Sequence, residues 1–250
     1  MIHYHGGPIT PLEAGYAAWK RAHAFVSYFY PHQARFAAEN AHSFALDNGA
    51  FSAWVSGKAM DFGGYAEWVD VWRRHPGFDW CLIPDVIDGD WEDNARLIAE
   101  WAHPKFYSVP IWHLHEPLEW LARLVADFPR VAFGSSGQWG TPGADAWWHR
   151  MSQAMEVVCD SQGRPMARLH GLRMLDPTIF SHLPLASADS TNIARNVGLD
   201  ERAKVRWGDD PFPPMTKDQR AVSMRNNIEF HASAARWVGR EIQKNFELVG

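Results

Sequence analysis

Short hydrophobic runs alternate along this chain with longer stretches in which hydrophobic residues recur every third or fourth position. The short runs predict β-strands, because brief apolar segments bounded by turn residues suit a buried sheet. They fall at 24–29, 43–46, 80–83, 106–110, 131–133, 168–170 and 185–188, and residues 2–4 are the candidate for an eighth strand.

The stretches between these runs predict helices that bury one face. Residues 65–72 have hydrophobic side chains at the i, i+3, i+4 and i+7 positions, and similar patterns recur in 91–102, 118–125 and 147–158. Near the start, Thr10 as N-cap and Pro11 at the first helical position predict a helix that runs to about residue 22. Near the end, an irregular loop at 198–217 precedes a final helix, whose hydrophobic residues are Ile228, Trp237, Val238 and Ile242.

Strands separated by helices of this length predict parallel pairing with right-handed crossovers. Seven or eight such units fit a closed barrel better than an open sheet, and barrels of this kind often reach 250 residues as one domain. We therefore expect an α/β protein, a (β/α)8 barrel of the TIM type, with residues 1–250 in a single catalytic domain.

The composition excludes several other classes of protein. A hydrophobic fraction of 46% and a charged fraction of 21% are not those of a disordered chain, and two cysteines cannot form a Cys-rich zinc site. Charged residues or His interrupt every apolar run before the roughly 18 residues that a membrane helix needs. With no secretory signal recognisable, we expect a reduced, cytoplasmic protein, located in the host cytoplasm if a phage encodes it.

The net charge of -5 does not favour a surface that binds polyanions throughout. Residues 195–225 could still form a local basic track for a nucleic acid. This stretch contains seven basic and five acidic residues, a net charge of +2. A solvated mixed surface explains this stretch equally well. The basic residues are Arg195, Arg202, Lys204, Arg206, Lys217, Arg220 and Arg225.

Polar residues follow most of the predicted strands, where catalytic groups of such barrels are found. Three are carboxylates: Asp47, Asp85 and Asp189. An Asp after a strand is often only the N-cap of the next helix. Thr191 is a good N-cap two residues beyond Asp189 and frees that carboxylate. Asp47 precedes the turn pair Asn48-Gly49 and is not needed as a cap either, although an Asx-turn is its alternative structural role.

Two carboxylates on opposite walls of a pocket suit displacement at an anomeric carbon, where one attacks and the other transfers a proton to or from the base. The strand-end motifs, taken in order over residues 43–195, resemble the tRNA-guanine transglycosylase family, and most of all its short phage relatives that insert 7-deazaguanine bases into DNA. The motifs are Asp47-Asn48-Gly49-Ala50-Phe51, Asp85, Pro110-Ile111-Trp112-His113, Gly134-Ser135-Ser136-Gly137, His170-Gly171-Leu172, and Asp189 six residues before Arg195.

The resemblance implies roles for these residues. Asp189 is the nucleophile and Asp47 transfers protons, while Phe51 stacks on the base. The remaining base-binding residues are Asp85, His113, Gly134, Ser135, His170 and Leu172. The family's glutamine is absent, as is its Cys-rich zinc site near the C-terminus, because no cysteine follows Cys159.

The missing zinc site favours DNA over tRNA as the substrate. We expect replacement of guanine in DNA by a 7-deazaguanine base, such as 7-cyano-7-deazaguanine, through a covalent aspartyl-deoxyribosyl intermediate. This pentosyltransferase needs no metal and no cofactor, and Arg195, Arg202, Lys204 and Arg206 would contact the nucleic-acid backbone. The sequence leaves the particular 7-deazaguanine, the strandedness of the DNA and the oligomeric state open.

Other functions remain open at this point, namely tRNA-guanine transglycosylase activity and a non-catalytic nucleic-acid-binding barrel. The chief rival is a metal-dependent hydrolase of the amidohydrolase type. His3 and His5 on a first strand, His113 and His170 at later strand ends, and a late Asp189 are similar to the metal ligands of those barrels.

Overall fold

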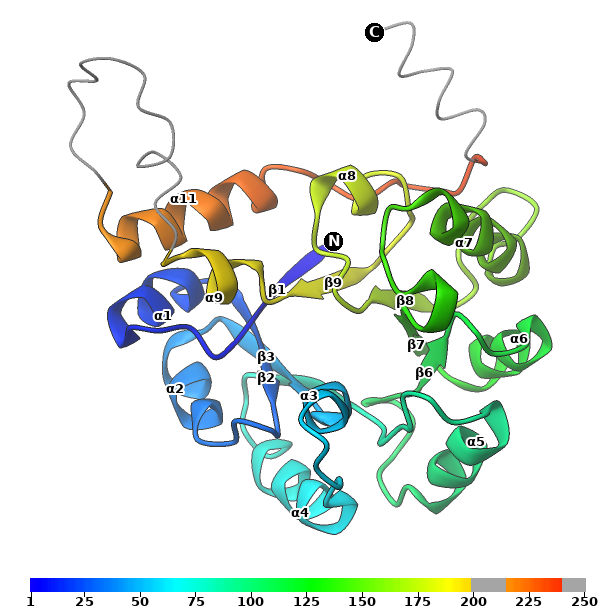
Figure 1. The fold of residues 1–250 in the computed structure, drawn as a ribbon, viewed down its shortest axis with the longest axis horizontal. Helices are drawn as coiled ribbons and strands as arrows, with labels where there is room; N and C mark the ends of the chain where they lie inside the picture. The colour runs from blue at the N-terminus through cyan, green and yellow to red at the C-terminus, as the bar shows by residue number, and fades with distance from the viewer. Residues whose placement is uncertain (199–214, 240–250) are drawn as a thin grey trace, which may run out of the picture.

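Parallel strands form a barrel that a ring of helices surrounds (Figure 1) in the computed structural model, which describes residues 1–198 and 215–239. The predicted α/β barrel is thereby confirmed. The strands are β1 (Ile2–Gly6), β2 (His23–Ser27), β3 (Ser43–Asp47), β4 (Phe78–Leu82), β5 (Ser108–Val109), β6 (Ile111–His113), β7 (Arg130–Gly134), β8 (Arg168–Gly171) and β9 (Ser187–Ser190).

The sheet order is β5-β4-β3-β2-β1-β9-β8-β7-β6, so β5 and β6 are its two edges. These two short strands follow each other in sequence and are separated only by Pro110, which has no N–H to donate to a neighbouring strand. β5 pairs with β4, and β6 pairs with β7. Together they fill one position of an eight-position barrel, and the continuous chain at Pro110 closes the ring.

A helix or helices follow each strand position, and most of them surround the barrel, whereas the helix after β3 lies nearer the centre of the view (Figure 1). Several begin at a carboxylate or hydroxyl cap, as the N-caps Asp61, Asp90, Asp176 and Thr216 show. The helices are α1 (Leu12–Trp19), α2 (Gln33–Asn40), α3 (Ala50–Val55), α4 (Phe62–Trp72), α5 (Trp91–Glu100), α6 (Leu118–Asp127), the 3-10 turn η1 (Gly137–Trp139), α7 (Asp145–Val158), α8 (Pro177–Phe180), α9 (Asn192–Asn196) and α11 (Lys217–Glu229). None of the helices in the described ranges has the length and hydropathy needed to span a bilayer.

Several predicted boundaries were wrong. α1 begins at Leu12 rather than Pro11, ends at Trp19, and has no side-chain cap from Thr10. The predicted strand at 106–110 continues past Pro110 to His113, because Pro110 interrupts the hydrogen bonding without turning the chain out of the barrel. The final helix ends at Glu229, so Trp237 and Val238 lie beyond it. Residues 199–214 of the predicted loop, and Ile242, fall outside the described residues.

Aromatic rings fill the barrel interior beneath its carboxyl end. Trp80 lies 5.5 Å from Tyr4 and 4.7 Å from His170, measured between ring centroids, and His170 lies 5.5 Å from Phe25. The Tyr4 hydroxyl donates to Asp79 at 2.7 Å and accepts from Trp80 Nε1 at 3.0 Å, which satisfies the buried polar atoms. This packed layer forms a rigid base for the residues above it.

Candidate active site

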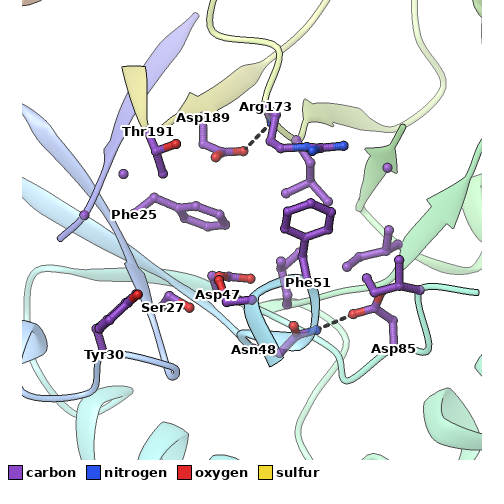
Figure 2. A pocket seen from close by; sticks show the side chains of 18 of the residues that line it. Phe25, Ser27, Tyr30, Asp47, Asn48, Phe51, Asp85, Arg173, Asp189 and Thr191 are labelled. Atoms are coloured by element: carbon purple, nitrogen blue, oxygen red, sulfur yellow. Dashed lines mark hydrogen bonds between the residues drawn. The ribbon is translucent and has the colours of Figure 1, made fainter. Parts of the chain in front are cut away.

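A cavity of about 420 Å³ opens at the carboxyl ends of the barrel strands. Its volume lies in the range of small-molecule sites, roughly 300–1,000 Å³. Figure 2 shows Asp189 on the side of β9 and Asp47 on the side of β3, both at the cavity wall. The predicted site residues that line it are Asp47, Phe51, Asp85, His113, Gly134, Ser135, Leu172, Asp189 and Arg195.

Asp47 is the last residue of β3, and a tight turn fixes its position. Gly49 in that turn has a φ of +82°, and a Cβ there would lie 2.8 Å from the Phe29 nitrogen, so only glycine fits. Enclosure by protein raises the pKa of Asp47 to about 7; the Asp189 and Asp85 charges also raise it, while hydrogen bonds from Ser27 and the Gly49 amide oppose the rise. Asp47 therefore exchanges protons near neutral pH.

Asp189 lies within β9 rather than after it, and its carboxylate is buried. Oδ1 accepts the Arg173 backbone N–H at 3.0 Å and lies 3.4 Å from His170 Nε2. That longer contact is not aligned as a hydrogen bond. Burial lowers the pKa of His170, so the ring beside Asp189 is neutral, and its Nδ1 pairs with the Ser187 hydroxyl at 2.8 Å. One carboxylate oxygen is thus oriented by the backbone while the side chain still reaches the cavity.

Asp85 belongs to a buried polar network that spans β3, β4 and β6. Its Oδ1 accepts from Asn48 Nδ2 at 2.7 Å, and its Oδ2 accepts from His113 Nε2 at 2.8 Å. Burial opposes protonation of His113, but the hydrogen bond and charge of Asp85, together with the Glu116 charge, outweigh it and raise the pKa of His113. Each carboxylate oxygen has two lone pairs, so Asp85 can still accept one hydrogen bond per oxygen from a ligand.

Asn48 holds this network together, and its removal is expected to destabilise the fold. The buried side chain donates to Ile83 O and Asp85 Oδ1 and accepts from Ala50 N. Asn48→Ala leaves buried groups unpaired, so we expect the free energy of unfolding to fall by about 2–4 kcal/mol, measured by urea denaturation. Asn40→Ala, which removes one hydrogen bond to Phe36 O on the partly exposed end of α2, is the matched control. Equal losses in both variants would contradict the role given to Asn48.

Gly134 and Ser135 form the wall opposite Asp47. A Cβ on Gly134 would lie 2.8 Å from His113 Nδ1, so glycine allows His113 to reach Asp85. The Ser135 hydroxyl accepts from Trp147 Nε1 at 2.9 Å, and the Ser135 carbonyl accepts from Arg173 Nη2 at 3.1 Å. Both side-chain and carbonyl groups of Ser135 therefore have partners within the protein.

Arg173 is a site residue that the sequence interpretation missed. Its guanidinium lies 4.4 Å from the ring centroid of Phe51 and reaches over that ring in Figure 2. Its backbone has a φ of +58°, an uncommon conformation for a residue with a side chain, and the same residue donates its N–H to Asp189. Its position directly after the Leu172 of a quoted motif is a signal that could have identified it.

Other lining residues were also missed. Phe25 and Ser27 come from β2, to which no site residue was assigned, and Tyr30 follows that strand. Ser27 ends β2 in the structure, but the predicted strand ran to residue 29, so the strand-end rule that found Asp47 passed over Ser27. Phe25 looks like ordinary core in the sequence, because only closure of the barrel shows that its ring borders a cavity.

Some predicted residues occupy other places. His170 does not line the cavity but lies behind Asp189, where it is fully buried. Thr191 is at the N-cap of α9 but its side chain accepts no capping hydrogen bond; Ser190 Oγ accepts from Asn192 N instead. Arg202, Lys204 and Arg206 lie outside the described residues.

Two further arginines of the predicted basic track have structural roles. Arg220 donates to the carbonyls of Val197 and Met215. Arg225 donates to carbonyls at the end of α1, Ala17 and Lys20 among them. Through Arg225, these contacts attach α11 to α1, and whether the stretch binds a nucleic-acid backbone stays a prediction.

The histidines of the amidohydrolase-type alternative do not come together. His3 and His5 face the outer helices, where His3 Nε2 contacts His231 O at 3.1 Å and His5 Nε2 contacts Glu229 at 3.0 Å, while Tyr4 between them points inward. This follows from the alternation of side chains along a strand. No group of three His, Cys, Asp or Glu side chains is placed to hold a metal ion within residues 1–198 and 215–239.

Neither a protein-family model nor a curated protein matches this chain. Among solved structures, the crystal structure of a protein assigned as a fructose-1,6-biphosphate aldolase from Coccidioides immitis is similar to it, with a TM-score of 0.53, 16% sequence identity, and coverage of 91% of this chain and 90% of that chain. At this identity the likeness shows the barrel fold alone. The chemistry of this chain has to be inferred from its cavity.

Proposed function

We propose that this protein is a base-exchange pentosyltransferase that replaces guanine in DNA with a 7-deazaguanine base. The observation that carries the proposal is the pair of carboxylates, Asp47 and Asp189, at one cavity whose other walls offer an aromatic ring and a buried polar network. The two residues stand on β3 and β9, which are separated by β2 and β1 in the sheet. A sugar ring between them has a carboxylate on either side, as double displacement requires.

Asp189 is the nucleophile in this proposal. Its oxygen attacks C1′ of the deoxyribose from the face opposite the base, and the bond between C1′ and N9 of guanine breaks. The Arg173 N–H on Oδ1 orients the carboxylate, and the neutral His170 beside it adds no positive charge that would weaken its attack. The product of this half-reaction is an ester between Asp189 and the sugar.

Asp47 moves the proton in both halves of the reaction. In its acid form it protonates the departing guanine, and the resulting carboxylate then takes the N9 proton of the incoming 7-deazaguanine, whose nitrogen attacks C1′ and releases Asp189 with overall retention. A pKa of about 7 suits this exchange, because both protonation states are accessible at neutral pH.

In this proposal, Phe51 and Asp85 recognise the base. Phe51 is 39% exposed and lines the cavity, so its ring is available to stack on a base. Asp85 is held in place by Asn48 and His113 and can accept hydrogen bonds from the N1–H and exocyclic amine that guanine and 7-deazaguanines share. Extracting a guanine from stacked DNA costs a few kcal/mol, which these contacts must offset.

Incubation of the protein with DNA and candidate 7-deazaguanines, followed by mass spectrometry of the released nucleosides, tests the proposal. We expect 7-deazaguanine deoxynucleosides in the DNA and a stoichiometric release of guanine. A parallel reaction with tRNA distinguishes the alternative substrate, since modified ribonucleosides without modified deoxynucleosides would assign the chain to tRNA. Absence of exchange into either nucleic acid, with the folded protein, would rule the proposed function out.

A further inference from the structure

A second cavity adjoins the active-site cavity between the loops that follow β8 and β9. Its volume is about 370 Å³, and it shares Arg173, Thr191 and Arg195 with the active-site cavity. Ser190 and Asn192 add further polar groups to its wall. The two arginines therefore lie at the boundary between the place proposed for the sugar and a polar groove that the proposed chemistry does not use.

The positive charges at this boundary are only partly balanced. Burial lowers the pKa of Arg173, and the nearby charge of Arg195 lowers that pKa further, whereas the charge of Asp189 raises it. The two guanidinium groups therefore repel each other. Arg195 is exposed, and its guanidinium has no hydrogen-bond or ion-pair partner among residues 1–198 and 215–239. Arg173 has one side-chain hydrogen bond in the same part of the chain, to the neutral carbonyl of Ser135.

Neither nearby carboxylate forms a direct ion pair with Arg173 or Arg195 within the described residues. Asp189 accepts the backbone N–H of Arg173 and faces the active-site cavity. Asp176 lines the groove, but its Oδ1 accepts from both the backbone N–H and the hydroxyl of Thr178 at the start of α8. An anion held between the two guanidinium groups would offset their repulsion and use donors that have no partner within residues 1–198 and 215–239.

We infer that Arg173 and Arg195, with the hydroxyls of Ser190 and Thr191, bind a phosphate group of the nucleotide whose sugar lies at Asp189. The arginine fork matches the oxygens of a phosphate, and the loops after the last two strands are a frequent phosphate position in barrels. Because Arg173 also donates its backbone N–H to Asp189, the phosphate and the nucleophile are positioned by one residue. The assignment of the bound phosphate to a substrate nucleotide rests on the proposed function. The anion site itself does not depend on that function.

Calorimetric titration of the full chain with inorganic phosphate tests the site without any base exchange. We expect saturable binding that weakens roughly 10-fold in Arg195→Gln and further in the Arg173→Gln, Arg195→Gln double variant, and that weakens as salt rises. Arg195 is exposed on α9, so its replacement leaves the packing of the barrel intact. Arg35→Gln, which removes one exposed charge on α2, is the matched control and should bind phosphate as the wild type does.

A second titration identifies the source of the phosphate. Deoxyguanosine 5′-monophosphate should bind roughly 10-fold more tightly than deoxyguanosine; Arg195→Gln should reduce that difference and the double variant should erase it. Equal phosphate affinity of the wild type and the double variant, or an equal loss in Arg35→Gln, would overturn the site. Phosphate binding with no gain for the nucleotide over the nucleoside would overturn its assignment to the substrate. If phosphate binds through these arginines but no base exchange occurs, the proposed function fails and the anion site stands.

Discussion

Asp189→Asn is expected to abolish base exchange, with a fall of roughly 10⁴-fold or more in turnover and loss of any protein–DNA adduct on denaturing gels. An amide retains the size of the side chain and can still accept the Arg173 N–H at the position of Oδ1, so the shape of the cavity is preserved. It is not a nucleophile toward C1′, and the covalent ester cannot form. The adduct is measured by trapping with labelled DNA in the absence of the incoming base.

The control for this variant is Asp145→Asn, which changes an exposed carboxylate in the first turn of α7 and should leave exchange at the wild-type rate. Circular dichroism of both variants shows whether the fold is retained. Persistence of the adduct in folded Asp189→Asn would assign the nucleophile to another residue, with Asp47 the first to test.

Asp47→Asn is expected to cause the second large loss of base exchange. The pH dependence of the rate of adduct formation shows whether lost proton transfer is the cause. In the proposed reaction, formation of the adduct requires protonated Asp47, whose pKa is raised to about 7. In the wild type the single-turnover rate should therefore be constant at acid pH and fall as pH rises through about 7. Asp47→Asn should lower the rate roughly 10²–10⁴-fold and remove that fall, because no group remains to titrate. The rates are measured by rapid-quench trapping of the adduct between pH 5 and pH 9.

Ser27→Ala provides a matched test of the same carboxyl. The Ser27 hydroxyl donates to Asp47 and favours its ionised form, so its loss should raise the pKa of Asp47. The fall in adduct formation should then move to higher pH, with little change of rate on the acid side. A profile identical to that of the wild type would show that a different group controls the proton transfer.

The barrel was predictable because its repeating units are local. Each strand is a short apolar run and each outer helix has one buried face, so the order of strands and helices follows from the sequence alone. The edges of these elements depend on partners that are distant in the chain. β9 extends to Ser190 because it pairs with β1, and this places Asp189 inside the strand instead of after it.

The candidate site was predictable to the extent that strand ends converge in every barrel. Asp47, Asp85 and Asp189 were found in this way, and they do line one cavity. The contribution of Arg173 depends on a loop that turns back across Phe51, and no local pattern encodes that path. Strand alternation predicts that His3 and His5 share one face of β1 and that Tyr4 lies on the other. Which face points inward is known only from the structure, where Tyr4 packs against Trp80 and His5 contacts Glu229.

The interruption of the barrel at Pro110 affects the pocket as well as the fold. β4 and β6 lie on the two sides of this seam; Asp85 follows the first, and His113 ends the second. Their ion pair, 2.8 Å long and buried, crosses the seam where backbone pairing is broken. A ligand that hydrogen-bonds to Asp85 would therefore engage one partner of the side-chain contact that links the ends of β4 and β6 at this seam.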